Sequence, residues 1–135
     1  MAQAEIWRLL GNKGDRVPFV VADGSTIAKG DFLELADNMV VTAHAGNVDT
    51  PIVGIAAEEK VANDGKLLIT GITNCIFKAT ILAGGSCTIG DPVSMGNAAG
   101  EVNLHTSDDN EKGWTVGMAY EDGAAGHTAL FKSTF

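Results

Sequence analysis

Three pairs of neighbouring carboxylates are the side chains best suited to chemistry in this sequence. They are Glu58-Glu59, Asp108-Asp109 and Glu121-Asp122. Paired carboxylates work as general acid and base when burial or a partner tunes their pKa values. Each pair here stands among polar and glycine residues that are typical of an exposed turn, so we expect solvated carboxylates. Residues 108–111 also lack the alternating ligands and the glycine of a calcium-binding EF-hand loop.

The other reactive residue types form no recognisable constellation. His44, His105 and His127 have no histidine or cysteine two or four positions further on, where a second metal ligand would share their face. The sequence contains no G-x-x-x-x-G-K-[ST] phosphate loop and no G-x-S-x-G nucleophile elbow. We therefore expect no catalytic residue, no metal and no cofactor, and a binding or structural protein rather than an enzyme.

Charge and hydropathy exclude two classes of partner. Seventeen acidic residues against 9 basic ones give a net charge of −8, and such a surface repels the phosphates of nucleic acid. No apolar run approaches the ~20 residues of a membrane span. The first residues lack the basic and apolar regions of a signal peptide. We expect a soluble protein made in a cytoplasm, with neither nucleic acid nor membrane as a partner.

The elements that carry these residues are organised by a short motif that occurs twice. Gly30-Asp31 recurs 60 residues later as Gly90-Asp91, each time directly before an apolar run. Glycine supplies a positive φ at a turn, and aspartate bonds to its own backbone there. The pairs are therefore expected to be turns that start strands at residues 32–35 and 92–95.

A second motif follows the first in both places. Val-Gly-x-Ala-x-Glu covers residues 53–58 and recurs 63 residues later at 116–121, with Gly54 and Gly117 at matching positions. Large apolar residues alternate with small or polar ones, which predicts a strand with one buried face. A glycine inside such a strand indicates a bulge or a close backbone approach. The paired motifs predict two similar halves, with pseudo-repeats at residues 27–65 and 88–126.

Composition agrees with an all-β fold. The 135 residues suit one domain, and 17 glycines with only 6% aromatic residues indicate many turns and a core of small apolar side chains. Residues 66–82 are the longest strand-forming stretch, where Gly71 is expected to introduce a bend or a bulge. The odd-numbered residues from Cys75 to Ile81 are apolar and alternate with polar ones. Cys75 and Cys87 fit either buried thiols or a hairpin disulfide. Further strands are expected at residues 17–21, 39–42, 101–105, 114–121 and 128–135.

Residues 1–16 stand apart as an N-terminal arm before a single β domain at residues 17–135. The arm brings large apolar side chains to one end of the chain and is followed by a glycine-rich loop. It packs on its own domain or docks on a partner, and its conformation as helix, strand or extended chain is open. If it docks, the anchor residues are Ile6, Trp7, Arg8, Leu9 and Leu10.

The repeated Gly-Asp strand opener, the repeated Val-Gly-x-Ala-x-Glu strand and the turn at residues 122–126 resemble the small head-decoration, or capsid cement, proteins of tailed bacteriophages. The resemblance covers about residues 17–135. It implies a compact β-barrel-like fold, called a β-tulip, bound to the outer surface of a viral head. The implied partners are the major capsid protein and further copies of the chain, with a trimer favoured. The implied location is the virion, after synthesis in the host cytoplasm.

A second function fits the same β-rich sequence. A carbohydrate- or cell-surface-binding module of a virion would also be small, β-rich and non-catalytic. Sugar sites stack rings, and besides its five phenylalanines the chain offers only Trp7, Trp114 and Tyr120. Trp114 and Tyr120 are expected on the buried face of one strand, which favours the capsid decoration protein.

Overall fold

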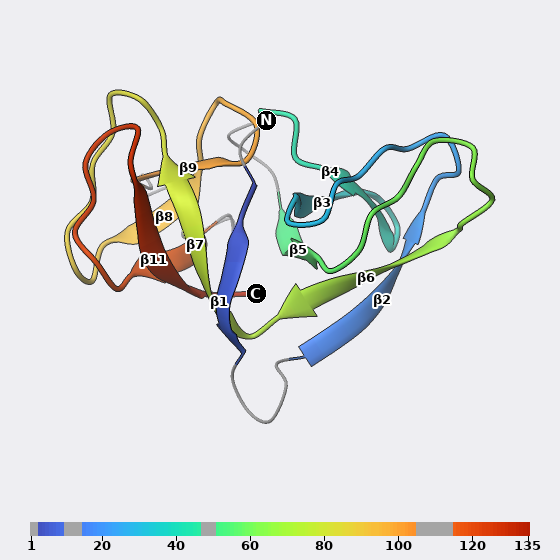
Figure 1. Ribbon diagram of the computed structural model, residues 1–135, viewed down its shortest axis with the longest axis horizontal. Helices are drawn as coiled ribbons and strands as arrows, with labels where there is room; N and C mark the ends of the chain where they lie inside the picture. The colour runs from blue at the N-terminus through green and yellow to red at the C-terminus, as the bar shows by residue number, and fades with distance from the viewer. Residues whose placement is uncertain (1–2, 10–14, 47–50, 105–114) are drawn as a thin grey trace.

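A computed structural model describes residues 3–9, 15–46, 51–104 and 115–135. These residues form two β-sheet lobes, which lie side by side along the long axis of the molecule (Figure 1). Within the described part of the chain, no helix is long and apolar enough to cross a membrane. The described strands are β1 (Glu5–Leu9), β2 (Asp15–Val21), β3 (Phe32–Asp37), β4 (Val40–Ala43), β5 (Ile52–Ala56), β6 (Leu68–Thr73), β7 (Cys75–Ile81), β8 (Pro92–Met95), β9 (Glu101–Leu104), β10 (Thr115–Ala119) and β11 (Thr128–Ser133).

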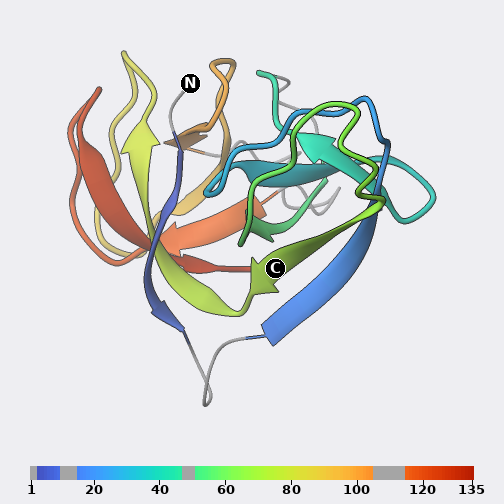
Figure 2. The ribbon, with the colours of Figure 1, turned by 45° about the vertical axis from the view of Figure 1, so that its right-hand side comes forward.

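Both lobes are closed rings with the same strand order. The first lobe runs β2-β4-β3-β5-β6 and closes between β6 and β2. The second runs β7-β9-β8-β10-β11 and closes between β11 and β7, with β1 added to β7. Each ring contains one parallel pair, β2 with β4 and β7 with β9, and the other pairs are antiparallel. The expected all-β, barrel-like fold of two similar halves is therefore confirmed (Figure 2).

The Gly-Asp pairs occupy equivalent turns in the two lobes. Gly30 has φ 92° and Gly90 has φ 88°, a region that favours glycine. In each turn the aspartate carboxylate accepts the backbone N–H three residues before it, at 2.9 Å for Asp31 and 2.9 Å for Asp91. Each turn leads directly into a strand, β3 or β8.

Gly54 and Gly117 also lie at equivalent places, in β5 and β10. The pairing register slips at both, between β3 and β5 and between β8 and β10. A Cβ on Gly117 would lie 2.8 Å from the Lys132 carbonyl oxygen, and one on Gly54 would lie 3.4 Å from the Ile72 carbonyl oxygen. Both glycines therefore allow the neighbouring strand to approach closely.

The bulge expected at Gly71 is absent, and the stretch is interrupted at another residue. Gly71 pairs in regular register with Val17, and a Cβ there would meet the Phe19 ring at 2.7 Å. The break falls at Asn74 instead, which adopts φ 51° between β6 and β7. Asparagine tolerates this conformation better than most residues. The Asn74 N–H donates to the Phe135 carbonyl oxygen at 3.0 Å, so the break is held by the end of the chain.

Two hydrophobic cores hold the lobes. The smaller one fills the first barrel. The larger one fills the second barrel and extends to Phe32, Ile55 and Ile72 of the first lobe, where the Phe32 and Phe77 rings meet edge to face at 5.5 Å. The two lobes therefore share the larger core. Cys75 and Cys87 belong to it as free, buried thiols, which leaves out the alternative of a disulfide.

Candidate functional site

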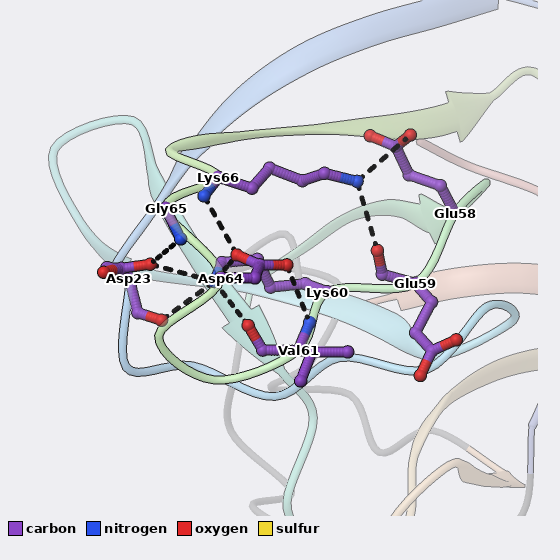
Figure 3. Close-up of polar contacts among 8 residues, drawn as sticks. All are labelled: Asp23, Glu58, Glu59, Lys60, Val61, Asp64, Gly65 and Lys66. Carbon is purple, nitrogen blue, oxygen red and sulfur yellow. Dashed lines mark hydrogen bonds and ion pairs between the residues drawn. The ribbon is translucent and has the colours of Figure 1, made fainter.

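The strongest buried polar cluster lies in the turn after β5 and centres on Lys60 (Figure 3). The Lys60 side chain is fully buried, and its ammonium donates to the Asp64 carboxylate at 2.7 Å. It also donates to the carbonyl oxygens of Asp23 at 2.8 Å and Val61 at 2.9 Å. These bonds use the three donors of an ammonium group. The cluster joins the Asp23 turn to the turn after β5. All three N–H groups of the Lys60 ammonium are used, so none is free to bind a substrate.

The hydrogen bond from Lys60 holds the pKa of Asp64 down to about 2, with a further contribution from the Lys66 backbone N–H. Because the ionised carboxylate accepts several donors, its charged form is favoured. In the second lobe the Thr88 backbone N–H donates to the Asp91 carboxylate at 2.9 Å, and this bond lowers the pKa of Asp91. Both carboxylates therefore organise turns.

Two of the paired carboxylates have a structural role that the sequence analysis did not identify. Glu58 accepts the backbone N–H of Thr70 in β6 at 3.1 Å, and Glu121 accepts that of Leu130 in β11 at 3.0 Å. The glutamate that ends each Val-Gly-x-Ala-x-Glu motif thus holds the next strand. The recurrence of this glutamate in both repeats is the sequence feature that could have indicated a structural role. Asp108 and Asp109 lie outside the described residues.

The histidines do not assemble a metal site in the described structure. His44 is buried, and its Nδ1 accepts the Gly100 N–H at 3.1 Å, which ties the first lobe to the β8–β9 turn of the second. His127 lies on an exposed turn, and His105 lies outside the described residues. Among residues 3–9, 15–46, 51–104 and 115–135, no group of three His, Cys, Asp or Glu side chains could hold a metal ion.

The N-terminal arm forms a strand. β1 pairs antiparallel with β7, from Glu5 opposite Lys78 to Leu9 opposite Cys75. Just before it, the Ala4 N–H donates to the Gly30 carbonyl oxygen of the first lobe at 2.8 Å. Ile6 packs partly buried against the larger core. The arm thus touches both lobes, while Leu10 lies outside the described residues.

β1 is the terminal strand of its six-stranded sheet and has one described neighbour, β7. A terminal strand presents backbone N–H and C=O groups along its other edge. Trp7 and Arg8 both belong to this strand. The arm therefore offers a place where an extended segment of another protein can add to the sheet.

A groove of about 480 Å³ runs beside the arm. Arg16 of β2 and Lys29 of the Gly30 turn line it together with one carboxylate, that of Glu5, so the groove keeps a net positive charge in an otherwise acidic protein. Neither cation forms an ion pair with a carboxylate in the described part of the chain. Apart from these two cations and Glu5, the lining consists of apolar residues and one glycine: Ala4, Ile6, Gly30, Ala56, Ala57 and Ile72.

Tyr120 does not lie on a buried face, and the expectation to the contrary is wrong. Its side chain is 44% exposed just after β10, next to the fully buried Ala119. Side chains alternate across a strand, and Tyr120 follows the outward set with Met118. Trp114, expected on the same face, lies outside the described residues.

Comparisons with known proteins point in one direction. A family model described as phage cement protein matches residues 11–133. Among solved structures, the N base of the head fiber gp8.5 of bacteriophage phi29 is similar, with a TM-score of 0.54 and 12% sequence identity over 89% of this chain and 93% of that chain. At this identity the likeness concerns the fold. No curated protein matches the chain.

Proposed function

This chain belongs to the phage cement protein family, and we propose on that basis that it coats the outer surface of a phage head and stabilises the shell. The observation that carries the proposal is the extent of the family match, residues 11–133 of 135. The family places the chain among capsid decoration proteins of the virion. Its role is structural and non-enzymatic, its partner is the major capsid protein, and its synthesis takes place in the host cytoplasm.

The proposed contact with the shell is the N-terminal arm, residues Ile6, Trp7, Arg8, Leu9 and Leu10. The terminal position of β1 supports this, because a segment of the capsid subunit can add to its outer edge by backbone hydrogen bonds. Burial of large apolar side chains adds about 1.5–3 kcal/mol each, before the cost of ordering both partners. Ile6 contributes by holding the strand on its own core.

The groove beside the arm supplies the electrostatic part of the contact. Arg16 and Lys29 suit a carboxylate on the incoming segment, and the apolar lining suits the flanking side chains. Charges at the rim of an interface act mainly on partner choice and association rate. The proposed occupant is therefore an extended, acidic segment exposed on the shell.

Several copies bind together, and a trimer is the proposed assembly. A small protein with weak single contacts gains avidity of ~10²–10⁴ when linked copies bind at once. A closed cyclic trimer also matches a three-fold position on a shell. Gly30, Asp31, Gly54, Gly90, Asp91 and Gly117 serve as turn and bulge residues that shape the module.

Binding to heads assembled without the protein tests this proposal. Lys29→Glu should weaken binding by about tenfold, because a rim cation becomes a like charge facing the acidic segment. Lys66→Glu is the matched control, since it changes the net charge equally at a lysine that does not line the groove. It breaks the ion pair with Glu58, so its fold is checked by circular dichroism. Trp7→Ala should weaken binding as well, with the fold checked in the same way. If Lys29→Glu and Trp7→Ala both bind heads like the wild type, the arm and its groove are not the contact.

A further inference from the structure

We infer that two exposed apolar patches, one on each lobe, bind each other between copies of this chain. The first, the β10 patch, consists of Ile89, Met118 and Tyr120. The second, the β2 patch, consists of Val20, Met39 and Leu68. This inference deepens the proposed trimer by naming its contact surfaces, and it does not depend on binding to a head.

Comparing the two lobes position by position identifies the β10 patch. In the first lobe, Phe32, Ile55 and Ile72 lie opposite one another across β3, β5 and β6. Their outward faces are buried against the second lobe, with at most 7% exposure. The row therefore forms the contact by which one module covers another.

The equivalent row in the second lobe is Pro92, Met118 and Lys132, which lie opposite one another across β8, β10 and β11. Here Met118 is 42% exposed. Tyr120 stands where the first lobe has Ala57. The N–H of Ala57 donates to the Thr70 carbonyl oxygen of β6, and the N–H of Tyr120 donates to the Leu130 carbonyl oxygen of β11. In this molecule the surface that covers such a face is another copy of the module, and a second copy of the chain supplies one.

The β2 patch is apolar, although the fold of the module does not require apolar residues at these positions. Val20 and Leu68 lie directly opposite each other on β2 and β6, and they are 43% and 56% exposed. The matching residues of the second lobe are Thr80 and Thr128, which are also directly opposite each other. The same backbone thus forms with threonine at both places. Met39, 59% exposed, adjoins the pair because its carbonyl oxygen accepts the Val20 N–H.

The two patches belong to different lobes of the molecule. The end of β2 and the start of β6 lie in one lobe, while β10 belongs to the other lobe with β8 and β11 (Figure 1). One copy cannot bring its own patches together. A contact between unlike patches of successive copies is head-to-tail, and such contacts close into rings when the rotation allows. Each interface of the proposed trimer then pairs one β10 patch with one β2 patch.

Charge gives the contact a characteristic salt response. Each copy carries a net charge of −8, so copies repel one another at low ionic strength. Raising the salt from ~0.1 M to ~1 M shortens the screening length from ~10 Å to ~3 Å. Because the patches themselves are apolar, added salt should strengthen association rather than weaken it.

Sedimentation of the full-length protein tests the inference. One variant carries Met118→Glu and Tyr120→Glu, and a second carries Val20→Glu and Leu68→Glu. The control carries Val61→Glu and Leu104→Glu, two exposed apolar positions outside both patches with the same change in charge. Wild type and control should associate, more strongly in high salt, and each patch variant should be monomeric. An equimolar mixture of the two patch variants should form dimers, because one intact patch of each kind remains.

Three results would overturn the inference. Wild type that stays monomeric at about 100 μM in high salt has no such contact in solution. A mixture of folded patch variants that stays monomeric shows that the contact is not between unlike patches. If Met118→Glu and Tyr120→Glu abolish head binding but leave association intact, the β10 patch faces the shell. Failure of wild-type head binding, by contrast, contradicts the proposed function and leaves the association result standing.

Discussion

Lys60 marks the clearest chemical difference between the two halves at the residue scale. Its backbone pairs with Ile27, and the equivalent bridge in the second lobe joins Cys87 to Gly123. A Cβ on Gly123 would lie 2.1 Å from Ile81 Cδ1, so any larger residue there would force the buried Ile81 side chain to move. The first lobe instead carries a buried lysine whose charge is neutralised by Asp64. The same turn is thus stabilised by an ion pair in one half and by apolar packing in the other.

Asp64→Asn should reduce the acid sensitivity of the protein. The folded protein holds the pKa of Asp64 at about 2, below its ordinary value of 3.8. Its ionised form therefore contributes stability that is complete above about pH 4 and is lost as the pH falls toward about 2. The free energy of unfolding, measured by urea titration across this range, should fall more steeply in the wild type than in the variant. Parallel curves for the two proteins would contradict the role assigned to the Lys60–Asp64 pair.

Both cysteines should be inert in the folded protein. Burial raises the pKa of Cys75 to about 11 and also raises that of Cys87, so neither is a thiolate near neutral pH. A thiol reagent at about pH 8 should label native protein only as fast as it unfolds, and should label two thiols at once in denaturant. Rapid labelling of either cysteine under native conditions would show that the core around it opens.

The sequence predicted that Glu58 and Glu121 lie in turns, but not which groups their carboxylates bind. The turn location of Glu58 and Glu121 followed from their neighbours. Their bonds to Thr70 and Leu130 did not, because those partners come from the next strand and are brought close only by the closed ring. The exposure of Tyr120 was missed for a related reason. Alternation gives two faces for a strand, but which face is covered depends on the other lobe.

At the scale of elements, the arm and the Gly30 turn depend on each other. Gly30 and Gly90 share a positive φ, so replacement by alanine costs each about 1–2 kcal/mol of strain. A Cβ on Gly30 would in addition lie 2.6 Å from the Ala4 carbonyl oxygen, whereas one on Gly90 meets nothing within 4 Å. The arm is therefore held by a contact that only one of the two equivalent turns makes.

Gly30→Ala should destabilise the protein more than Gly90→Ala and should loosen the arm. The free energy of unfolding of the two variants separates the clash from the shared backbone strain. Hydrogen exchange of the β1 amides should accelerate in Gly30→Ala alone. Equal stability and equal exchange in the two variants would mean that the arm does not rely on its contact with Gly30.

The strands themselves followed from the sequence where the pairing partner is close along the chain. The Gly-Asp turns and the alternating residues of β7, β8 and β10 predicted their elements because turn chemistry and one buried face are local signals. The arm was left open between helix and strand, since its partner β7 is distant in sequence. The break at Asn74 was missed because it is set by a bond to the last residue, Phe135.

At the scale of the whole molecule, the two lobes are one module used twice with different surroundings. The second lobe covers the Phe32–Ile55–Ile72 row of the first, and His44 adds a polar contact between them. In the described structure the first lobe does not cover the corresponding row of the second lobe, so Met118 stays exposed. A repeated module thus produces an asymmetric molecule, with the arm and its groove beside the junction of the lobes.

The central claim is that this protein binds the outside of a phage head and stabilises the shell, and the most direct measurement is the temperature at which heads rupture. Heads assembled without the protein are titrated with it, and bound copies and rupture temperature are recorded together. We expect saturable binding and a rupture temperature that rises with occupancy, with weaker effects for Gly30→Ala and Lys29→Glu than for Gly90→Ala and Lys66→Glu. Heads that bind no protein, or that bind it to saturation and rupture at an unchanged temperature, would contradict the account.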